Sequence, residues 1–369
     1  MVEIKQQQQQ SLPTSPLKIM ICSGENDDLG HQLAETLVKR GAKVTLLVHP
    51  NHTSSNYVKH LTETIGCEFV LGGAMEDEPL ELVKKLHGQN VIISASLRNS
   101  LLHPMVQYKT DINLLKTCHL YALQPNSDFR CFIPCQWSFD FTKFTTPVVK
   151  QEEVEWNWIE CKKGFLQMLR ADNGGVPYMS FFTGFPMDFL IEFLVDSVNK
   201  QIKCYGEDWN DYQIVCTSIN DICQLASEKI LHINPLSSFS TQEFTFYGEC
   251  CSLKQIAQHL NYKLTLLGSV DDCTRKITNL RDKILQCDHH GCEKEKYELA
   301  CLLIMQFIAS GNFKNYTFSP QPGYTVTGPT SHLGGPMIME KKYEFDRLEN
   351  LVNKIGSSSS QVKGLTPNQ

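Results

Sequence analysis

The sequence predicts an α/β fold in which helices cover a doubly wound parallel β-sheet. Strand-like apolar runs alternate with amphipathic helical patterns through the first hundred residues, which is the βαβα pattern of such a sheet. A glycine-containing turn, Gly24 to Gly30, joins the first strand-like run to the first helix. Gly41 stands where that helix should end.

The expected elements follow one another in a regular order. Leu33, Leu37 and Val38 recur at helical spacing and support the first helix. Strands are expected at 19–22, 43–48, 67–71, 91–94, 129–134 and 178–183, and helices at 29–40, 57–65, 80–86 and 217–232.

Composition indicates a globular protein that works on small molecules. The chain has 369 residues, 41% of them hydrophobic and 20% charged, enough for one large or two medium domains. A formal net charge of -6 argues against a nucleic-acid-binding or anionic-membrane surface.

The sequence also predicts a compartment. The glutamine run Gln6 to Gln10 leaves no room for the apolar core of a secretory signal, and no later segment offers a membrane-spanning run of about 18 apolar residues. The 15 cysteines are scattered and odd in number, so we expect reduced thiols. These observations predict a location in the cytoplasm, with the nucleus as the alternative.

Several short motifs stand in a fixed order along the chain. They are Leu29-Gly30 with the turn at 40–44, Gly72-Gly73-Ala74-Met75-Glu76-Asp77, Val91-Ile92-Ile93-Ser94-Ala95, the strand end at 132–140, Val176-Pro177-Tyr178 with Thr183-Gly184-Phe185, and Ile219-Asn220-Asp221-Ile222. Over residues 17 to 310 this order resembles the NmrA-like and isoflavone-reductase-like family of atypical short-chain dehydrogenases/reductases. The resemblance implies a Rossmann-type sheet that binds NAD(P).

The resemblance also implies a domain organisation. Residues 17–235 would form the dinucleotide-binding domain, and 236–355 a smaller C-terminal substrate or partner region packed on it. The ends, 1–16 with the glutamine run and 356–369 with Gly-Ser-Ser-Ser-Ser, have too little apolar content to order themselves. We expect both to be disordered tails.

The first turn departs from the family pattern at one position. In the G-x-x-G-x-x-G spacing, Gly24 and Gly30 fill the outer places and Asp27 falls on the middle one. The turn normally lets backbone N–H groups approach a pyrophosphate. A carboxylate about 4 Å from the phosphates would cost roughly 4 kcal/mol at an effective dielectric of about 20, and about 1 kcal/mol in water.

Two conformations of this turn have opposite consequences. Asp27 or Asp28 is an ordinary N-cap for the helix that begins near Leu29. If Asp27 points inward, the cofactor site is weakened or lost. If Asp28 is the cap and Asp27 turns outward, dinucleotide binding persists.

The resemblance assigns further cofactor contacts. Leu29 belongs to the phosphate turn, and Ser94, Ala95 and Pro134 follow the fourth and fifth strands. His49 stands at the end of the second strand, where an acid would select NAD and the family often has arginine for the 2′-phosphate of NADP. NADP is therefore favoured over NAD, and the alternative for His49 is a loop histidine without a ligand.

The proton donor common in short-chain reductases is missing. The tyrosine that stands four residues before a lysine is replaced by Trp158, and an indole cannot deliver that proton. The isoflavone-reductase branch is thought to work with the lysine alone, which maps to Lys162, with Lys163 as the rival. A solvated helix-face lysine is the alternative for Lys162, and a strand-core aromatic is the preferred interpretation of Tyr178.

One cysteine- and histidine-rich segment resembles metal ligands only superficially. Cys287-Asp288-His289-His290-Gly291-Cys292, with Cys273 upstream, matches no familiar zinc spacing, so no metal site is expected.

Two functions follow as expectations. The first is an NADPH-dependent reductase of a small carbonyl or conjugated substrate, with Lys162 as proton relay or ribose anchor. The second is a non-catalytic regulator that senses a dinucleotide or binds a protein partner. The missing tyrosine and Asp27 both favour the regulator.

Overall fold

The structure is a computed structural model that describes residues 16–22, 27–144, 157–172, 175–206, 213–234, 239–286 and 292–309. In these ranges no helix is long and apolar enough to cross a membrane.

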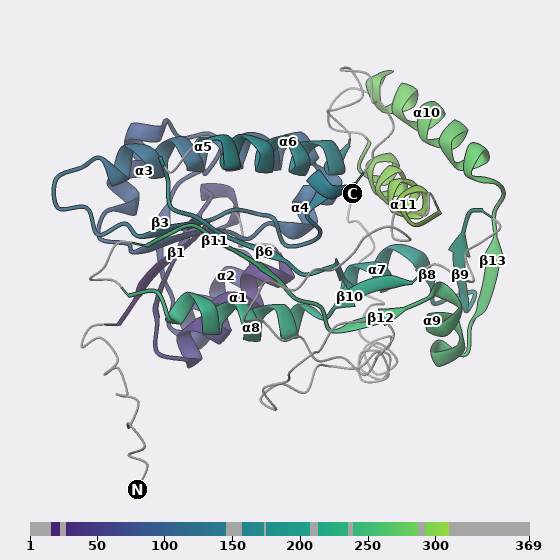
Figure 1. The fold of residues 1–369 in the computed structure, drawn as a ribbon, viewed down its shortest axis with the longest axis horizontal. Helices are drawn as coiled ribbons and strands as arrows, with labels where there is room; N and C mark the ends of the chain where they lie inside the picture. The colour runs from purple at the N-terminus through teal and green to yellow at the C-terminus, as the bar shows by residue number, and fades with distance from the viewer. Residues whose placement is uncertain are drawn as a thin grey trace, which may run out of the picture.

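A parallel sheet forms the centre of the molecule (Figure 1). Its strands are β1 (Lys18–Cys22), β2 (Lys43–Val48), β3 (Glu68–Leu71), β4 (Val91–Ser94) and β5 (Cys131–Ile133), in the order β3-β2-β1-β4-β5. An isolated parallel bridge between Phe132 and Tyr178 continues this order to β6 (Met179–Phe182), which pairs in parallel with β11 (Gln242–Thr245). The predicted doubly wound parallel sheet is confirmed.

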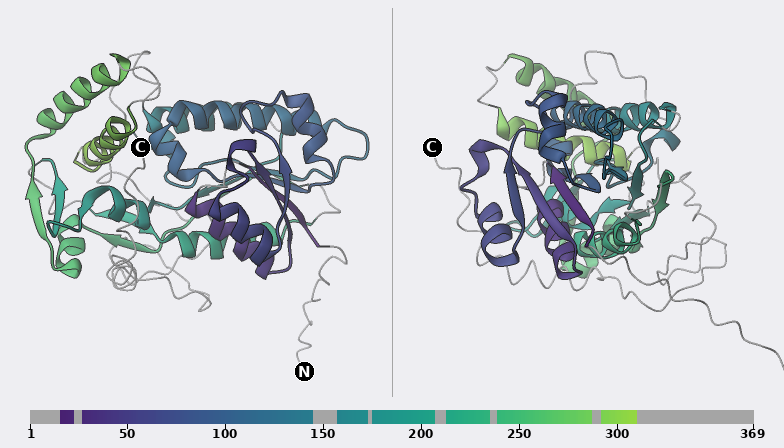
Figure 2. Two further views of the ribbon diagram at one scale, coloured as in Figure 1. Left: turned by 180° about the vertical axis from the view of Figure 1, so that it is seen from behind. Right: turned by 90° about the vertical axis from the view of Figure 1, so that its left-hand side faces the viewer.

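Helices cover both faces of the sheet, as Figures 1 and 2 show. One face carries α1 (Asp28–Lys39) and α8 (Ile219–Leu231), and the other carries α3 (Pro79–Leu86), α5 (Pro104–Ala122) and α6 (Trp158–Ala171). Side chains alternate across a strand, so Ile19 and Ile21 of β1 join the first core while Met20 and Cys22 join the second. Burial on both faces explains why the strands read as unbroken apolar runs.

The remaining elements form the connections and the end of the molecule at which α10 and α11 lie. The connections are η1 (Pro50–His52), α2 (Asn56–Lys59), the π-helical turn η2 (His60–Ile65), α4 (Leu97–Leu102) and η3 (Phe141–Lys143). The others are β7 (Phe185–Pro186), α7 (Met187–Leu194), β8 (Val195–Asp196), β9 (Gln201–Cys204), β10 (Ile214–Thr217), β12 (Glu249–Cys251), α9 (Leu253–Leu260), β13 (Lys263–Leu266), α10 (Val270–Gln286) and α11 (Glu293–Ala309).

The sequence pattern located the strands and most helices of the sheet region but missed α5. This helix has no apolar stripe, because Gln107, Thr110, Asp111 and Thr117 are buried on it. The helix expected at 57–65 is α2 followed by η2. The boundary between 235 and 236 stays a prediction, and both expected tails lie outside the described residues, apart from Pro16.

One glycine in this framework is required for two separate reasons. Gly184, between β6 and β7, has a φ of +71°, and a Cβ there would lie 2.6 Å from the carbonyl oxygen of Val215. Gly41 has a φ of +92° with nothing within 4 Å of an added Cβ.

We expect Gly41→Ala to lower the free energy of unfolding by about 1–2 kcal/mol for the strained backbone alone, and Gly184→Ala to lower it by about 1 kcal/mol more. Urea unfolding measures both, and equal costs would contradict the close approach to Val215.

Candidate functional site

The candidate site lies where the strand order of the sheet reverses. The chain runs from β1 outward to β3 and then returns to β4 on the other side of β1. In open α/β sheets, ligands bind beyond the carboxyl ends of the strands at this switch point. The residues that follow β1, β4 and β5 therefore define the site.

Asp27 lies at the switch point, where it is the N-cap of α1 and also contacts the segment after β4. One carboxylate oxygen, Oδ1, accepts a hydrogen bond from the backbone N–H of Leu29 at 3.0 Å, within the first turn of α1. The other oxygen, Oδ2, accepts a hydrogen bond at 2.5 Å from the backbone N–H of Arg98, a residue that follows β4. Asp27 is only 2% exposed. Of the two conformations open to the turn, the structure has the inward one.

Burial changes the acidity of Asp27. Loss of hydration raises the pKa of its carboxyl group to about 7, against the lowering effect of the two backbone N–H donors. The neighbouring Asp28 raises this pKa further. The side chain therefore changes charge close to neutral pH.

The other predicted residues of the phosphate turn are placed unevenly. Leu29 and Gly30 are buried in the first turn of α1. Gly24 lies outside the described residues. Asp28 accepts a hydrogen bond at 2.9 Å from the hydroxyl of Tyr57, so the segment after β2 is tied to the start of α1.

His49 follows β2 and has a local role in the backbone. Its Nδ1 accepts from the N–H of Asn51 at 3.2 Å and caps η1, and its ring lies 5.6 Å from that of His52. The assignment of His49 to a 2′-phosphate stays a prediction.

The predicted residues after β4 and β5 lie together. The N–H of Ala95 donates to the carbonyl of Cys22 at 3.2 Å, and Ser94 Oγ accepts from Gln107 Nε2 at 2.9 Å. Pro134 accepts a backbone hydrogen bond from Gln136 at 2.7 Å. The carboxyl end of β4 is thus connected to that of β1 through Ala95 and to α5 through Ser94.

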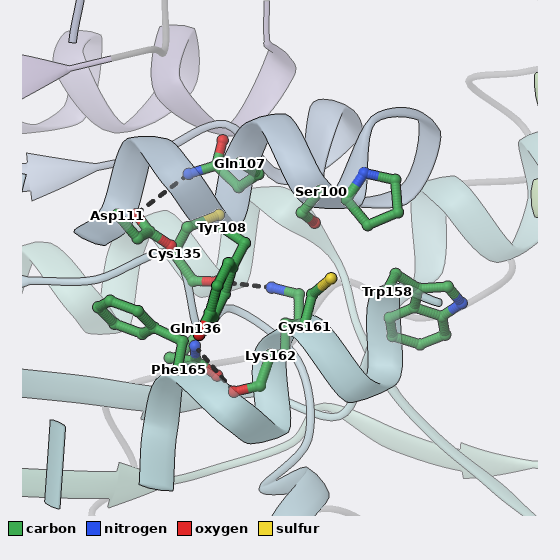
Figure 3. Close-up of a pocket in the computed structure, with 11 residues that line it drawn as sticks. Ser100, Gln107, Tyr108, Asp111, Cys135, Gln136, Trp158, Cys161, Lys162 and Phe165 are labelled. Carbon is green, nitrogen blue, oxygen red and sulfur yellow. Dashed lines mark hydrogen bonds between the residues drawn. The ribbon is translucent and has the colours of Figure 1, made fainter. Parts of the chain in front are cut away.

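Lys162 reaches this cluster from α6, which begins after the N-cap Asn157. Lys162 is 6% exposed, and its Nζ donates to the carbonyl of Cys135 at 2.6 Å (Figure 3). Lys163 is more exposed and lies 4.0 Å from Glu160. The structure therefore places Lys162, and not its rival, against the ends of the strands.

Two residues of this cluster were missed from the sequence. Asp111, 3% exposed on α5, accepts from Gln107 Nε2 at 3.1 Å. Burial raises the pKa of Asp111 to about 6, opposed by a hydrogen bond to Ser94 and by the charge of Lys162. The spacing of Gln107 and Asp111, one helical turn apart, was the available signal, but it is also typical of a solvated helix face.

A small cavity lies beside Lys162. Its volume of about 10 Å³ is about that of one water molecule by the same measure. Figure 3 shows Gln107, Asp111, Cys135, Gln136 and Lys162 around it, with Trp158 to one side. Within the described part of the chain, the Oε1 of Gln136 is buried without a hydrogen-bond partner.

Neither Trp158 nor Tyr178 supplies a proton donor to the cavity beside Lys162. Trp158 is 1% exposed and packs edge to face against Phe141 at 5.0 Å between ring centroids. The hydroxyl of Tyr178 donates to Glu243 at 3.0 Å, and burial and this carboxylate raise its pKa. The same carboxylate accepts two hydrogen bonds from the guanidinium of Arg170. Tyr178 therefore belongs to a network beside the sheet.

No group of three or more His, Cys, Asp or Glu in the described ranges could hold a metal ion. Cys273 and Cys292 are buried, and 287–291 lie outside those ranges.

Comparison with known proteins identifies the fold. No family model and no curated protein matches the sequence. Leucoanthocyanidin reductase from Vitis vinifera, in binary complex with NADPH, superposes with a TM-score of 0.62 at 13% identity, over 91% of this chain and 98% of its own. Isoflavone reductase gives 0.59 at 12% identity, over 92% and 100%. AtPrR2 with NADP+ and (+)-pinoresinol gives 0.56 at 11% identity, over 83% and 91%. This chain therefore has the fold of these reductases.

Proposed function

We propose that this chain is a non-catalytic regulator on a reductase fold, which senses an NADP-type dinucleotide with low affinity at neutral pH. The observation that carries the proposal is the position of Asp27. Its carboxylate takes the N–H groups of Leu29 and Arg98 at the switch point of the sheet. In a dinucleotide-binding sheet, a pyrophosphate binds at that place.

The residues present do not fit a pyrophosphate while Asp27 is ionised. A phosphate oxygen would have to displace the carboxylate from both N–H donors, and its negative charge would meet a second one in a site from which water is excluded. Asp28 adds another negative charge at the same helix start. The structural neighbours that share this fold include complexes with NADPH and NADP+.

The surroundings of α6 also support a non-catalytic role. General acid catalysis needs a proton donor within reach of the substrate. Trp158 is packed among aromatic rings, and Tyr178 is held by Glu243. The cavity beside Lys162 has room for about one water molecule.

One observation favours a second function, an NADPH-dependent reductase of a small carbonyl or conjugated substrate. Lys162 is buried at the ends of β4 and β5, and its positive charge lowers the pKa of the nearby Asp111. In that function the ammonium of Lys162 would donate the proton or hold a ribose hydroxyl. Its present hydrogen bond to the carbonyl of Cys135 would have to open first.

Titration with reduced dinucleotides tests both functions. We expect NADPH to give a weak but saturable change in nicotinamide fluorescence at pH 7, weaker still with NADH, and no NADPH consumption with a panel of aldehydes, ketones and enones. Turnover that Lys162→Met abolishes, while Lys163→Met leaves it intact, would establish the reductase instead. If neither NADPH nor NADH binds, both functions are overturned.

A further inference from the structure

The side chain of Asp27 connects two separate parts of the fold. The N–H of Leu29 belongs to α1, whereas the N–H of Arg98 belongs to the first turn after β4. The two donors converge on one carboxylate that is 2% exposed. Two converging N–H groups are the means by which a protein backbone holds an anion.

A second observation concerns a buried hydroxyl group close to Arg98 in the sequence. Ser96 precedes Arg98 by two residues and is completely buried. Its Oγ has no hydrogen-bond partner among the described residues, and it does not cap α4. Buried hydroxyl groups are nearly always satisfied, so this one is expected to meet an ordered water, an ion or a bound ligand.

The donor on the β4 side is held in place from outside the site. The guanidinium of Arg98 donates two hydrogen bonds to the carboxylate of Glu192 on α7, at 3.0 and 2.5 Å. The hydroxyl of Tyr297 on α11 donates to the carbonyl of Glu192 at 3.2 Å. These contacts hold the backbone of Arg98 in place. Its N–H therefore points at the switch point whether the acceptor is the carboxylate of Asp27 or a phosphate.

We propose that Asp27 is a built-in anion in the pyrophosphate position, and that a dinucleotide binds there only together with one proton. The proton passes from solvent to the carboxylate of Asp27. The neutral acid then holds the two N–H groups less strongly and donates its own O–H to a phosphate oxygen. The inference rests on the proposed function in one respect, namely that the dinucleotide binds at this switch point.

The charges around Asp27 are consistent with a proton-linked site. Its pKa is about 7, so both forms are populated near neutral pH. Several titratable or charged groups from neighbouring elements interact with it, namely Asp28 of α1, Arg98 of α4, Tyr57 of α2, Cys135 after β5 and Cys223 of α8. Arg98 is the single cation in this described set, and its charge is shared with Glu192.

Calorimetric titration with NADP+ at pH 6 and pH 8 tests the proposal, because the oxidised dinucleotide survives the acidic buffer. At pH 8 about one molecule in ten carries the proton, so the affinity of the wild type should be about tenfold lower than at pH 6. Asp27→Asn, which is neutral and of the same shape, should bind at pH 8 about tenfold more tightly than the wild type. Asp27→Gly, which also removes the charge, should likewise bind NADP+ more tightly than the wild type at pH 8.

Asp28→Asn is the matched control. It removes one negative charge from the same helix start without touching the N–H of Leu29 or Arg98, and it sees the same ionisation of the ligand phosphate. It should keep a pH-dependent affinity, with the midpoint moved to lower pH because the charge of Asp28 raises the pKa of Asp27. Titrations in buffers of different ionisation enthalpy should show about one proton taken up per NADP+ at pH 8 in the wild type and Asp28→Asn, and about none in Asp27→Asn.

The possible failures are distinct. Wild-type binding that is independent of pH and unchanged in Asp27→Asn would overturn the proton-linked site while leaving a dinucleotide sensor. If neither Asp27→Asn nor Asp27→Gly binds NADP+ at either pH while both remain folded, the dinucleotide site itself is absent, and the sensor function fails with it. Binding with turnover in the wild type would overturn the non-catalytic role alone.

Discussion

Between pH 4 and pH 8, the stability of the Asp27→Asn variant is expected to rise relative to that of the wild type by up to about 4 kcal/mol. The pKa of Asp27 is raised from 3.8 to about 7 by burial, and each pKa unit corresponds to about 1.4 kcal/mol. The folded protein therefore holds a proton that the unfolded chain has already released between about pH 4 and pH 7. The stability of the wild type falls as pH rises through this window and is level above it.

Urea unfolding of the two proteins at intervals from pH 4 to pH 8 measures this difference. At pH 4 the folded wild type holds Asp27 protonated, and Asp27→Asn should be the less stable protein because its amide nitrogen cannot accept the second backbone N–H. The difference should then shift in favour of Asp27→Asn up to about pH 7. Asp28→Asn provides the control, with a change of about 1 kcal/mol or less for its hydrogen bond with Tyr57. A difference between Asp27→Asn and wild type that does not vary with pH would show that Asp27 titrates normally in the fold.

The Trp158→Ala variant is expected to lose about 3–5 kcal/mol of unfolding free energy, the cost of removing a large buried aromatic side chain. Trp158 is 1% exposed, and its ring lies 5.0 Å from Phe141, 6.3 Å from Phe185 and 6.0 Å from Phe307. Phe307 belongs to α11, so the indole joins the helices of the sheet region to the C-terminal helices. A single unfolding transition, shifted as a whole, is the expected result.

Trp158→Phe is the matched control for this effect. It keeps an aromatic ring in the cluster and removes an indole N–H that has no partner among the described residues. Its cost should be at most about 1.5 kcal/mol. Equal losses in the alanine and phenylalanine variants would contradict the packing role of the ring. Two separate transitions in Trp158→Ala would indicate that the C-terminal helices unfold on their own.

The sheet was predictable because its signals are local in sequence. Apolar runs buried on both faces, the helical spacing of Leu33 and Leu37, and Gly41 after the first helix each reflect a short-range physical requirement. The helix α5 was missed for the opposite reason. Gln107 and Asp111 are satisfied by each other and by Ser94 across the fold, and no local pattern shows that polar residues will be buried.

Part of the candidate site was likewise predictable from the sequence, and part was not. The family resemblance assigned Lys162 to the site and set Asp27 at the middle glycine position, and the sequence shows that no tyrosine precedes this lysine by four residues. It left open which of two adjacent acids caps α1, because Asp27 and Asp28 are equally good caps by residue type. It also contained no sign of Arg98 as a partner of Asp27, 71 residues away.

The sequence by itself therefore determined the fold class, which follows from periodicity and the order of motifs along the chain, while the residues assigned to the cofactor were those that the family resemblance implies. Only the tertiary structure decided that the carboxylate of Asp27 turns inward, that a backbone N–H after β4 receives it, and that burial brings its pKa to about 7. The physical reason is that hydration and hydrogen bonding depend on which distant groups surround an atom. Those neighbours exist only once the chain has folded.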